Sequence, residues 1–247
     1  MLTKQRHEII LKLLEEKGSI TVPEVRELLD TSESTVRRDI TALDQEGKLT
    51  KVFGGAVALD SRITTYEYTV AEKNDLSREE KQKIARYAAS LIAPKDFVYL
   101  DAGTTTAFMI DYIDETTASF VTNAVSHAQR LAARGMKVIL LGGELKASTE
   151  AVIGAQAMQM LVNYHFTRGF FGANGVTRKS GYTTPDASEA IIKRTACGHC
   201  EEVYMLCDSS KFGKVSSVTF ASFEGVNAVT EKRIPGYEEC ENIRIAE

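Results

Sequence analysis

Residues 101–106, with the sequence DAGTTT, combine residue types that can hold an anionic ligand. They follow the apolar run FVYL and precede another apolar run, which predicts a strand, a tight turn and the start of a helix. Gly103 permits the turn. The three threonines that follow, Thr104, Thr105 and Thr106, place hydroxyl groups beside the unpaired N–H groups of the helix start, which suits a phosphate. The alternative, that Thr104 only caps a helix and Gly103 only makes a turn, fits this loop equally well.

A later segment, DSSK at 208–211, can complete such a site. Lys211 is the best cation for a phosphate group, and the Asp208 carboxylate can accept a hydrogen bond from a sugar hydroxyl. Asp101 would repel a phosphate, so we expect it to orient loop amides or to hold a sugar hydroxyl. The sequence contains no G-x-x-x-x-G-K-[ST] loop and no G-x-G-x-x-G fingerprint, so we expect no nucleotide cofactor. A phosphorylated sugar would satisfy all of these groups.

The elements that must position these residues follow a regular order from residue 97 onward. Short apolar runs, namely FVYLD, SFVT, KVILLGG, GFFGAN and VYMLCD, alternate with helical patterns. This alternation predicts an α/β domain with a doubly wound, mostly parallel sheet. Ligands bind beyond the carboxyl ends of the strands in such sheets. The expected strands end in polar or glycine-rich stretches, which are 101–103, 122–123, 142–144, 172–175 and 208–211.

The first sixty residues contain a different kind of candidate site. The third of three helical patterns begins behind Ser32 as its cap and ends at Gly47, and its apolar face is narrow. The opposite face carries hydroxyl, amide and guanidinium groups, with Arg37 at its edge: Ser34, Arg38, Thr41 and Gln45. Such groups bind phosphates and read base edges in the major groove of DNA. A helix with a charged outer face can also be simply solvated.

A hairpin pattern follows this helix. Two short β-type runs in KLTKVFGGAVAL flank Gly54-Gly55, a dipeptide suited to a two-residue turn, and Lys48 and Lys51 lie on the first run. The helix before the third one opens with the capping-box spacing of Thr21 and Glu24. Three helices and a small hairpin together predict an α+β winged helix-turn-helix domain.

Charge and composition limit the partners. The net charge of −4 gives no general attraction to nucleic acid, so a DNA contact must come from a local basic patch. The first ten residues lack a signal-peptide core, and the longest uncharged stretch, 151–167, contains too many polar residues for a membrane span. We therefore expect a cytoplasmic protein without a membrane segment. We expect a DNA-binding domain at 1–58, a linker at 59–77 and a larger domain at 78–247.

The cysteine pair in CGHC, Cys197 and Cys200, has the spacing of thiol oxidoreductases. It follows a helical pattern, so it should lie at a helix C-terminus, where the helix dipole opposes a thiolate. A zinc site would need four ligands, and only scattered candidates remain. We expect ordinary reduced thiols and no metal.

The segment LLDTSESTVRRDITALDQEGKLTKVFGGAV resembles the N-terminal signature of the DeoR family of bacterial transcriptional repressors. The matching features are the serine before the third helix, the Thr-x-Arg-Arg-Asp core and the Gly-Gly of the wing. The resemblance implies contacts to operator DNA, with support from two lysines of the wing. The implied contact residues are Ser32, Ser34, Thr35, Arg37 and Arg38, with Lys48 and Lys51 from the wing.

The resemblance continues through DAGTTT, VTNA, LLGGEL, GANGV and DSSKFG, which look like the sensor domain of the same family. That domain is similar to ribose-phosphate isomerases and glucosamine-phosphate deaminases, and it binds sugar phosphates as effectors. The implied effector site comprises Asp101, Gly103, Thr104, Thr105, Asn123, Asp208 and Lys211, and the matched strand ends add Thr106, Gly143 and Glu144. The run EKQKIARYAASLIAPKDFVYLDAGTTT looks closest to fructose operon repressors, which would make fructose 1-phosphate the effector.

Three functions remain open at this point. The first is a repressor that acts as a homodimer or homotetramer and is controlled by a phosphorylated sugar. The second is a sugar-phosphate isomerase or deaminase with a DNA-binding domain, whose general base would be Glu144, Asp186 or Glu189. The third is a DNA-binding protein whose second domain only forms oligomers.

Overall fold

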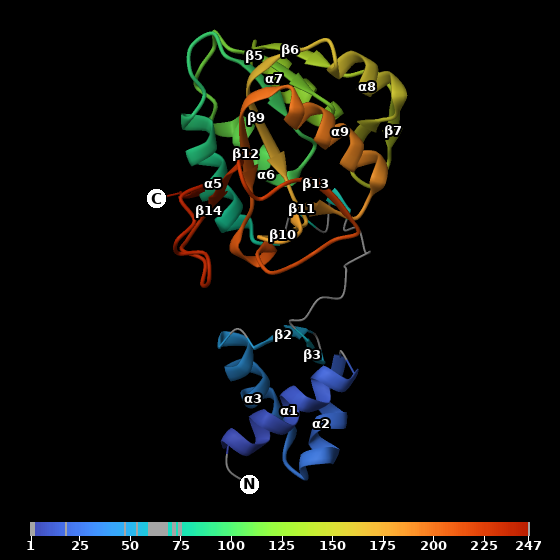
Figure 1. Ribbon diagram of the computed structural model, residues 1–247, viewed down its shortest axis with the longest axis vertical. Helices are drawn as coiled ribbons and strands as arrows, with labels where there is room; N and C mark the ends of the chain where they lie inside the picture. Colours follow the sequence, from blue (N-terminus) through green and yellow to red (C-terminus); the bar gives the residue numbers. More distant parts are fainter. Residues whose placement is uncertain are drawn as a thin grey trace. The chain divides into compact units, whose positions relative to one another are not determined.

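The computed structural model describes residues 3–17, 19–46, 48–52, 54–58, 69–70, 73 and 76–246. The chain divides into two compact units, Met1–Arg62 and Ile63–Glu247 (Figure 1). The boundary between them falls inside the segment that the sequence predicts to be a linker, 59–77, most of which lies outside the described residues. Among the described residues, no helix is both long and apolar enough to cross a membrane.

The first unit is a three-helix domain with a small antiparallel sheet of order β1-β3-β2. Its elements are α1 (Thr3–Lys17), β1 (Ser19–Thr21), α2 (Val22–Leu29), α3 (Glu33–Gln45), β2 (Leu49–Val52) and β3 (Gly55–Ala58). One apolar core joins the three helices to the sheet, and Ile10, Val25, Val36 and Leu43 are completely buried in it. This arrangement confirms the predicted winged helix-turn-helix.

Side-chain caps define where the second and third helices begin. Thr21 and Glu24 form the predicted capping box at the start of α2, and the Ser32 side chain accepts a hydrogen bond from the Thr35 N–H at the start of α3. Gly47, the predicted end of α3, lies outside the described residues, and the helix ends at Gln45.

The turn of the wing differs from the prediction by one residue. Gly55 is not part of the turn, because it pairs with Val52 as the first residue of β3. A Cβ atom at Gly55 would lie 2.0 Å from the carbonyl oxygen of Ile20 on the neighbouring strand β1. The second glycine is therefore required by the close approach of two strands. Gly54, with φ of +82°, is the residue that makes the turn.

The second unit contains a seven-stranded parallel sheet of order β15-β14-β12-β9-β4-β5-β6. Its strands are β4 (Phe97–Leu100), β5 (Ser119–Thr122), β6 (Lys137–Leu140), β9 (Phe166–Gly172), β12 (Cys200–Leu206), β14 (Asn227–Thr230) and β15 (Ile243–Ile245). The strand order reverses between β4 and β9, because β5 and β6 lie on one side of β4 and the later strands lie on the other. The predicted doubly wound fold is confirmed, and this reversal is where such sheets bind ligands.

Helices cover both faces of this sheet. They are α5 (Arg78–Ser90), α6 (Thr104–Met109), α7 (Val125–Ala133), α8 (Ala155–Leu161) and α9 (Ala187–Gly198), with short 3-10 helices η1 (Ile110–Tyr112) and η2 (Ser209–Lys211). Alternate residues of β4 contribute to the cores on the two faces of the sheet. Val98 and Leu100 pack in the core under α5 and α6, whereas Tyr99 packs in the core under α8 and α9. In Figure 1, α5 and α9 accordingly lie on opposite sides of β9 and β12.

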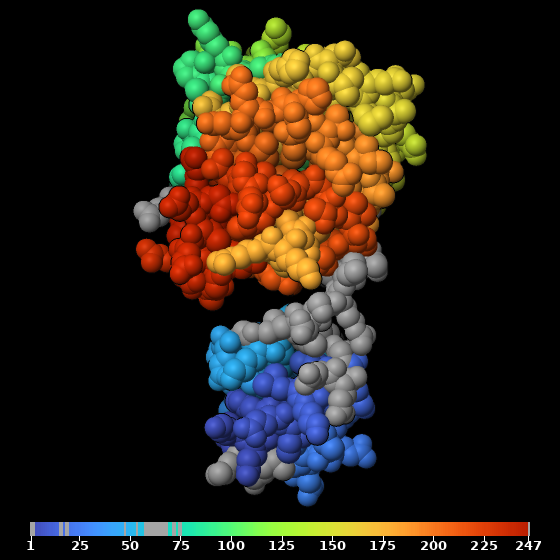
Figure 2. Space-filling view, in the orientation of Figure 1, coloured from blue at the N-terminus to red at the C-terminus, as the bar shows by residue number. Residues whose placement is uncertain are grey.

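Two small antiparallel sheets complete the unit. One contains β10 (Gly175–Thr177), β11 (Gly181–Thr184) and β13 (Val218–Ala221), and the other is the hairpin of β7 (Glu144–Lys146) and β8 (Ala151–Ile153). In Figure 2, α9 in orange and the C-terminal strands in red form one continuous face of the unit.

Candidate nucleic-acid interface and ligand crevice

The exposed face of α3 carries the residues that the sequence predicts to contact DNA. Ser32, Ser34, Arg37 and Arg38 are exposed, and Thr35 is half-buried. The Ser32 hydroxyl lies 2.9 Å from the hydroxyls of both Ser34 and Thr35. The three hydroxyl groups therefore form one cluster at the N-terminus of α3, where the helix dipole favours a phosphate.

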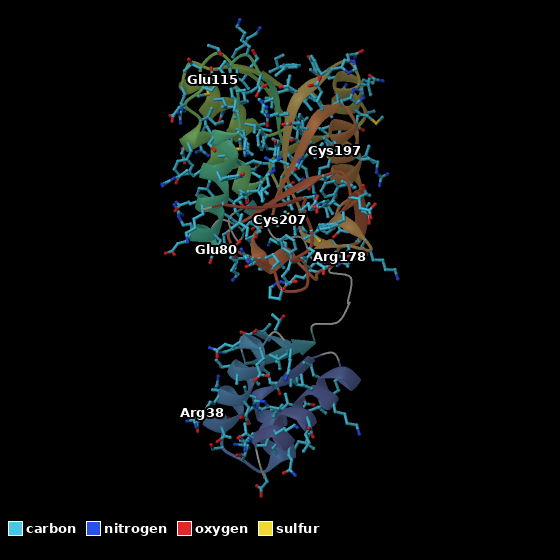
Figure 3. All side chains as sticks on the ribbon, turned by 60° about the vertical axis from the view of Figure 1, so that its left-hand side comes forward. Arg38, Glu80, Glu115, Arg178, Cys197 and Cys207 are labelled. Atoms are coloured by element: carbon cyan, nitrogen blue, oxygen red, sulfur yellow. The ribbon has the colours of Figure 1, made fainter. Side chains whose placement is uncertain are left out.

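The basic side chains of this face differ in their partners. Arg37 lies 3.5 Å from Glu33, and Lys48 lies 2.7 Å from Glu46, both as exposed ion pairs that water screens. The ammonium of Lys51 donates to the Thr41 hydroxyl at 2.9 Å, which ties the wing to α3. Arg38 has no hydrogen-bond or ion-pair partner among the described residues, and it extends outward from the unit in Figure 3.

A buried carboxylate fixes the orientation of α3. Asp39 is 3 % exposed and accepts two hydrogen bonds from the guanidinium of Arg6 on α1, at 2.6 and 2.9 Å. This paired geometry is the strong one for arginine and a carboxylate. Asp39 follows the arginine pair directly, so it holds the backbone that presents Arg37 and Arg38.

A crevice in the second unit lies at the reversal of strand order. The loops that follow β4, β9 and β12 form its floor, and α5, α9 and the β7–β8 hairpin contribute its walls. Of the predicted effector residues, it is lined by Gly103, Thr104, Thr105, Asp208 and Lys211. The Thr104 and Thr105 hydroxyls have no hydrogen-bond partner among the residues that the structure describes, so they are available to a ligand.

Asn123 and Thr106 support the loop after β4 from below and do not line the crevice. The Asn123 Oδ1 atom accepts a hydrogen bond from the Ala102 N–H at 2.9 Å. The Thr106 hydroxyl, which is fully buried, lies 2.7 Å from the Asp101 carbonyl oxygen and 2.8 Å from that of Gly103. Both residues fix the shape of the loop rather than face a guest molecule.

Asp101 is 1 % exposed and connects β4 to β9 beneath the crevice. Its carboxylate accepts a hydrogen bond from the Gly172 N–H at 3.1 Å and pairs with the ammonium of Lys193 on α9. The same ammonium donates to the Gly172 carbonyl oxygen at 3.1 Å. Burial raises the pKa of the Asp101 carboxyl, and the nearby Lys193 charge opposes this shift.

Gly143 and Glu144 are not brought to the crevice. They follow β6, which is the edge strand of the sheet and is separated from β9 by β5 and β4. Gly143 instead starts the β7–β8 hairpin, where a Cβ atom would lie 2.5 Å from the Ile153 carbonyl oxygen. Glu144 is exposed on β7. Neither Gly143 nor Glu144 lines the crevice, because β6 is the strand farthest from β9 on its side of the sheet.

Lysines are the most numerous charged residues in the lining of the crevice. Four of the described lining residues are lysines, Lys73, Lys81, Lys193 and Lys211, and two are carboxylates, Glu189 and Asp208. Lys211 lies 3.8 Å from Asp208, which caps η2 by accepting from the Ser210 N–H at 3.0 Å. The lining therefore carries excess positive charge and suits an anion.

Glu189 is the carboxylate on the α9 side of the crevice. One of its oxygens, Oε1, accepts hydrogen bonds from the Thr149 hydroxyl and from Lys146. The other oxygen has no partner among the described residues and can accept a hydrogen bond from a ligand. Asp186 caps α9 by accepting from the Glu189 N–H at 2.8 Å and pairs with Lys146 at 2.9 Å, so it has a structural role.

Sequence reasoning missed Lys81 and Lys193 as crevice residues. Both occupy core positions of the helical period: Lys81 precedes Ile84, Ala85 and Ala88, which are completely buried on the same face of α5. A lysine in a row of buried apolar residues is unusual, because isolated buried charge is costly. That position in the period is the signal that could have identified both residues.

The CGHC cysteines lie where α9 ends and β12 begins, and both are partly buried free thiols. Burial raises the pKa of the Cys200 thiol to about 12, which opposes formation of a thiolate. Among the described residues, no group of histidines, cysteines and carboxylates could hold a metal ion. Figure 3 labels Cys197 within the second unit.

Comparison with known proteins identifies both units. Residues 6–62 match the DeoR-like helix-turn-helix domain, and residues 76–232 match the DeoR C terminal sensor domain. The chain belongs to the DeoR family. A similar protein is FruR of Bacillus subtilis (strain 168), named as an uncharacterized HTH-type transcriptional regulator. It is 40% identical over 232 residues, which cover 93% of this chain and 90% of FruR.

A lactose phosphotransferase system repressor of Streptococcus mutans is 36% identical over 93% of this chain and 92% of its own length. Among solved structures, ribose 5-phosphate isomerase A from Methanocaldococcus jannaschii aligns with a TM-score of 0.42 and 16% identity, over 55% of this chain and 54% of that one. The DeoR-family relatives are regulators over nearly their whole length. The chain is accordingly a DNA-binding transcriptional repressor, and the enzyme alternative is not supported.

Proposed function

We propose that this DeoR-family protein represses an operon for sugar catabolism and that a phosphorylated sugar in the crevice changes its affinity for the operator. The observation that carries the proposal is the lining of the crevice. Four lysines and two threonine hydroxyls, which have no hydrogen-bond partner in the part of the chain that the structure describes, surround a space beyond the strand ends. Ammonium and hydroxyl donors bind phosphate oxygens, and carboxylate acceptors such as Asp208 and Glu189 bind sugar hydroxyls.

The proposed operator contacts lie on α3 and the wing. The hydroxyl cluster of Ser32, Ser34 and Thr35 would bind backbone phosphates, and the exposed guanidinium of Arg38 would reach base edges or phosphates in the major groove. Arg37, Lys48 and Lys51 would add phosphate contacts around that helix. Because such a protein works on the chromosome of a bacterium, the proposal places it in the cytoplasm.

Fructose 1-phosphate is the first effector to test. The resemblance of residues 80–106 to fructose operon repressors supports it, and the second relative above is named for a sugar phosphotransferase system. A homodimer or homotetramer would present two or more winged domains to repeated half-sites. The effector must bind one state of the protein more tightly than the other, and a coupling of about 1–3 kcal/mol changes operator affinity about 5–150-fold.

A thermal-unfolding screen tests the effector part of this proposal. The full chain is heated with fructose 1-phosphate, fructose 6-phosphate, lactose 6-phosphate and unphosphorylated fructose. An effector at one hundred times its dissociation constant should stabilise the protein by about 2.7 kcal/mol. A sugar phosphate that stabilises the chain is then added to a complex of the protein with its upstream promoter DNA. Fluorescence anisotropy measures the change in affinity for the DNA.

The matched pair of variants for this screen is Lys211→Met and Lys179→Met. Both remove one lysine charge, but Lys179 is exposed and does not line the crevice. The effector response should be lost in the first variant and kept in the second. If no sugar phosphate stabilises the wild-type chain, or if Lys211→Met responds as the wild type does, the crevice is not the effector site.

A further inference from the structure

The two outer strands of the seven-stranded sheet are built differently. Strand β15 carries a charged residue at its centre, Arg244, whose guanidinium donates to the Asn227 side chain at 3.3 Å. Strand β6 instead has three aliphatic residues in succession, Val138, Ile139 and Leu140. A charge or a proline within an outer strand discourages it from pairing with another chain. The centre of β15 is protected in this way, whereas the centre of β6 is not.

The outer edge of β6 continues toward β7. Among the described residues, β6 pairs only with β5, and β7 pairs only with β8. Leu140 of β6 is 39% exposed, and Leu145 of β7 is 55% exposed. Each of the two strands therefore leaves one side without a neighbouring strand and displays an exposed leucine. Both features are typical of a surface that pairs with another chain.

The end of α8 extends this surface without adding charge. The N–H of Gly142, which lies between β6 and β7, donates to the Met160 sulfur at 3.2 Å, so the end of α8 lies beside this loop. Val162, which directly follows α8, is 48% exposed. The stretch 151–167, which includes α8, contains no charged residue. Protein–protein interfaces are likewise depleted of charged residues at their centre.

Two exposed charges of opposite sign lie at the two ends of β6. Lys137 is the first residue of β6, and Glu144, the first residue of β7, lies beyond the other end of β6. Neither side chain has an ion-pair or hydrogen-bond partner in the part of the chain that the structure describes, and both are exposed. A two-fold axis across β6 would bring the positive end of one copy to the negative end of another. The surface is therefore complementary in charge to itself.

We propose that a second copy of this chain docks on this surface, with the two β6 strands antiparallel about a two-fold axis. The surface, the β6 margin, comprises Lys137, Leu140, Glu144, Leu145 and Val162. Its apolar side chains cover those of the other copy, and each Lys137 pairs with Glu144 of the partner subunit. The inference rests on the homo-oligomeric repressor of the proposed function and names its interface. Because the contact is isologous, every pair occurs twice, and the dimer carries two winged domains.

An exchange of the two charges tests this arrangement in the full chain, without sugar phosphate and without DNA. Sedimentation equilibrium measures the dissociation constant of self-association for Lys137→Glu, Glu144→Lys and the double variant. Each single variant places like charges together at two symmetric positions, so the dissociation constant should rise about tenfold. The double variant restores opposite charges across the interface and should associate as the wild type does. Since the two side chains form no ion pair within one chain, such a rescue must arise between copies.

Leu140→Glu tests the apolar centre of the β6 margin. A glutamate there faces its own copy across the two-fold axis, so the variant should be monomeric at concentrations at which the wild type is associated. Leu28→Glu is the matched control, because it makes the same change at a residue of α2 that is 54% exposed. Amide hydrogen exchange then reports on strand pairing. The amides of β6 should exchange more slowly in the associated wild type than in monomeric Leu140→Glu.

The outcomes separate this interface from the proposed function. Equal self-association of the wild type, Lys137→Glu and Leu140→Glu overturns the β6 margin as the interface and leaves the repressor intact. A double variant that associates as weakly as the single variants overturns the antiparallel arrangement, because the two charges would then not meet. A wild type that stays monomeric at every concentration overturns this interface together with the homo-oligomer of the proposed function. The effector and operator tests described above are independent of all three results.

Discussion

The two candidate sites are built in opposite ways. The proposed DNA contacts come from one continuous segment, residues 32–51, and most of their side chains are exposed. The crevice combines residues from 70 to 211, including residues of α5, α6, α9 and η2, and most of its charged groups are buried. A surface that binds a large partner can be displayed by one helix, whereas a pocket for a small molecule requires several elements to converge.

This difference predicts how substitutions will behave. An exposed arginine costs little in the free protein, so its removal should change binding and leave stability unchanged. A buried charge that is paired across the fold, as Lys193 is with Asp101, should change stability and binding together when it is removed.

The largest effect is expected for Lys193→Met. The substitution leaves the Asp101 carboxylate buried without its cation, and breaking such a pair typically costs about 3–5 kcal/mol. Chemical unfolding of the full chain, monitored by a spectroscopic signal from the second unit, measures the change in the free energy of unfolding. The double variant Asp101→Asn/Lys193→Met should recover part of the loss, because the uncompensated charge is gone.

Lys211→Met is the matched control for this prediction. Lys211 lines the same crevice, but its side chain is 28% exposed and its ion pair with Asp208 is long. Its removal should change stability by no more than about 0.5 kcal/mol. Equal losses in Lys193→Met and Lys211→Met would show that burial does not separate the roles of these lysines.

The sequence was sufficient for the first unit because its site follows the helical period. Ser32 marks the start of α3 by its capping chemistry, and the apolar face of α3 determines which residues are exposed. In the second unit the same reasoning found the strands, since buried parallel strands are continuous apolar runs. It also found the loop after β4 and the DSSK segment after β12, because both are polar stretches that directly follow buried apolar runs.

Pairing between distant residues could not be predicted. Lys193 and Asp101 are 92 positions apart, and they meet because α9 packs against the sheet in which β4 and β9 are neighbours. Gly143 and Glu144 were predicted as effector-site residues for the same reason. The order of strands in the sheet is not visible in one sequence, so their distance from the crevice could not be foreseen. The strand order brings the loops after β4, β9 and β12 together and places the loop after β6 at the edge of the sheet.

The next effect in size is expected for Arg38→Ala. Arg38 has no partner among the described residues, so its loss should leave the stability of the first unit within about 0.5 kcal/mol of the wild type. Operator affinity should fall by about 1–3 kcal/mol if Arg38 contacts a base, with reduced discrimination at that position. Fluorescence anisotropy with wild-type and altered operators at fixed salt concentration measures both.

Lys12→Ala provides the control for Arg38→Ala, since it removes one exposed positive charge from α1. It should reduce operator affinity much less. A similar loss in both variants would mean that the general charge of the unit, and not the face of α3, determines binding.

The third prediction concerns pH and the crevice. Lys81, whose pKa is about 8, carries its charge below that pH and loses it above, so affinity for the sugar phosphate should fall as the pH rises beyond 8. The limiting slope is about tenfold per pH unit. Because a bound phosphate favours the charged ammonium, binding near pH 8 should take up protons, which calorimetry in buffers of different ionisation enthalpy detects. In Lys81→Met the proton uptake and the loss above pH 8 should disappear, and persistence of either would assign them to another group.

The smallest effect is expected at Ser32, which combines a structural role with a proposed contact to DNA. Its hydroxyl caps α3 and also belongs to the cluster that would bind a phosphate of the operator. Ser32→Ala removes both roles and should destabilise the start of α3 by about 1 kcal/mol, seen as faster amide hydrogen exchange there. Ser32→Asp keeps the cap, because aspartate accepts the same N–H, but it places a negative charge beside the DNA. The aspartate variant should therefore protect α3 as serine does and bind operator more weakly than the alanine variant. If the two variants bind operator equally, Ser32 acts only as a cap and the DNA-contacting surface begins further along α3.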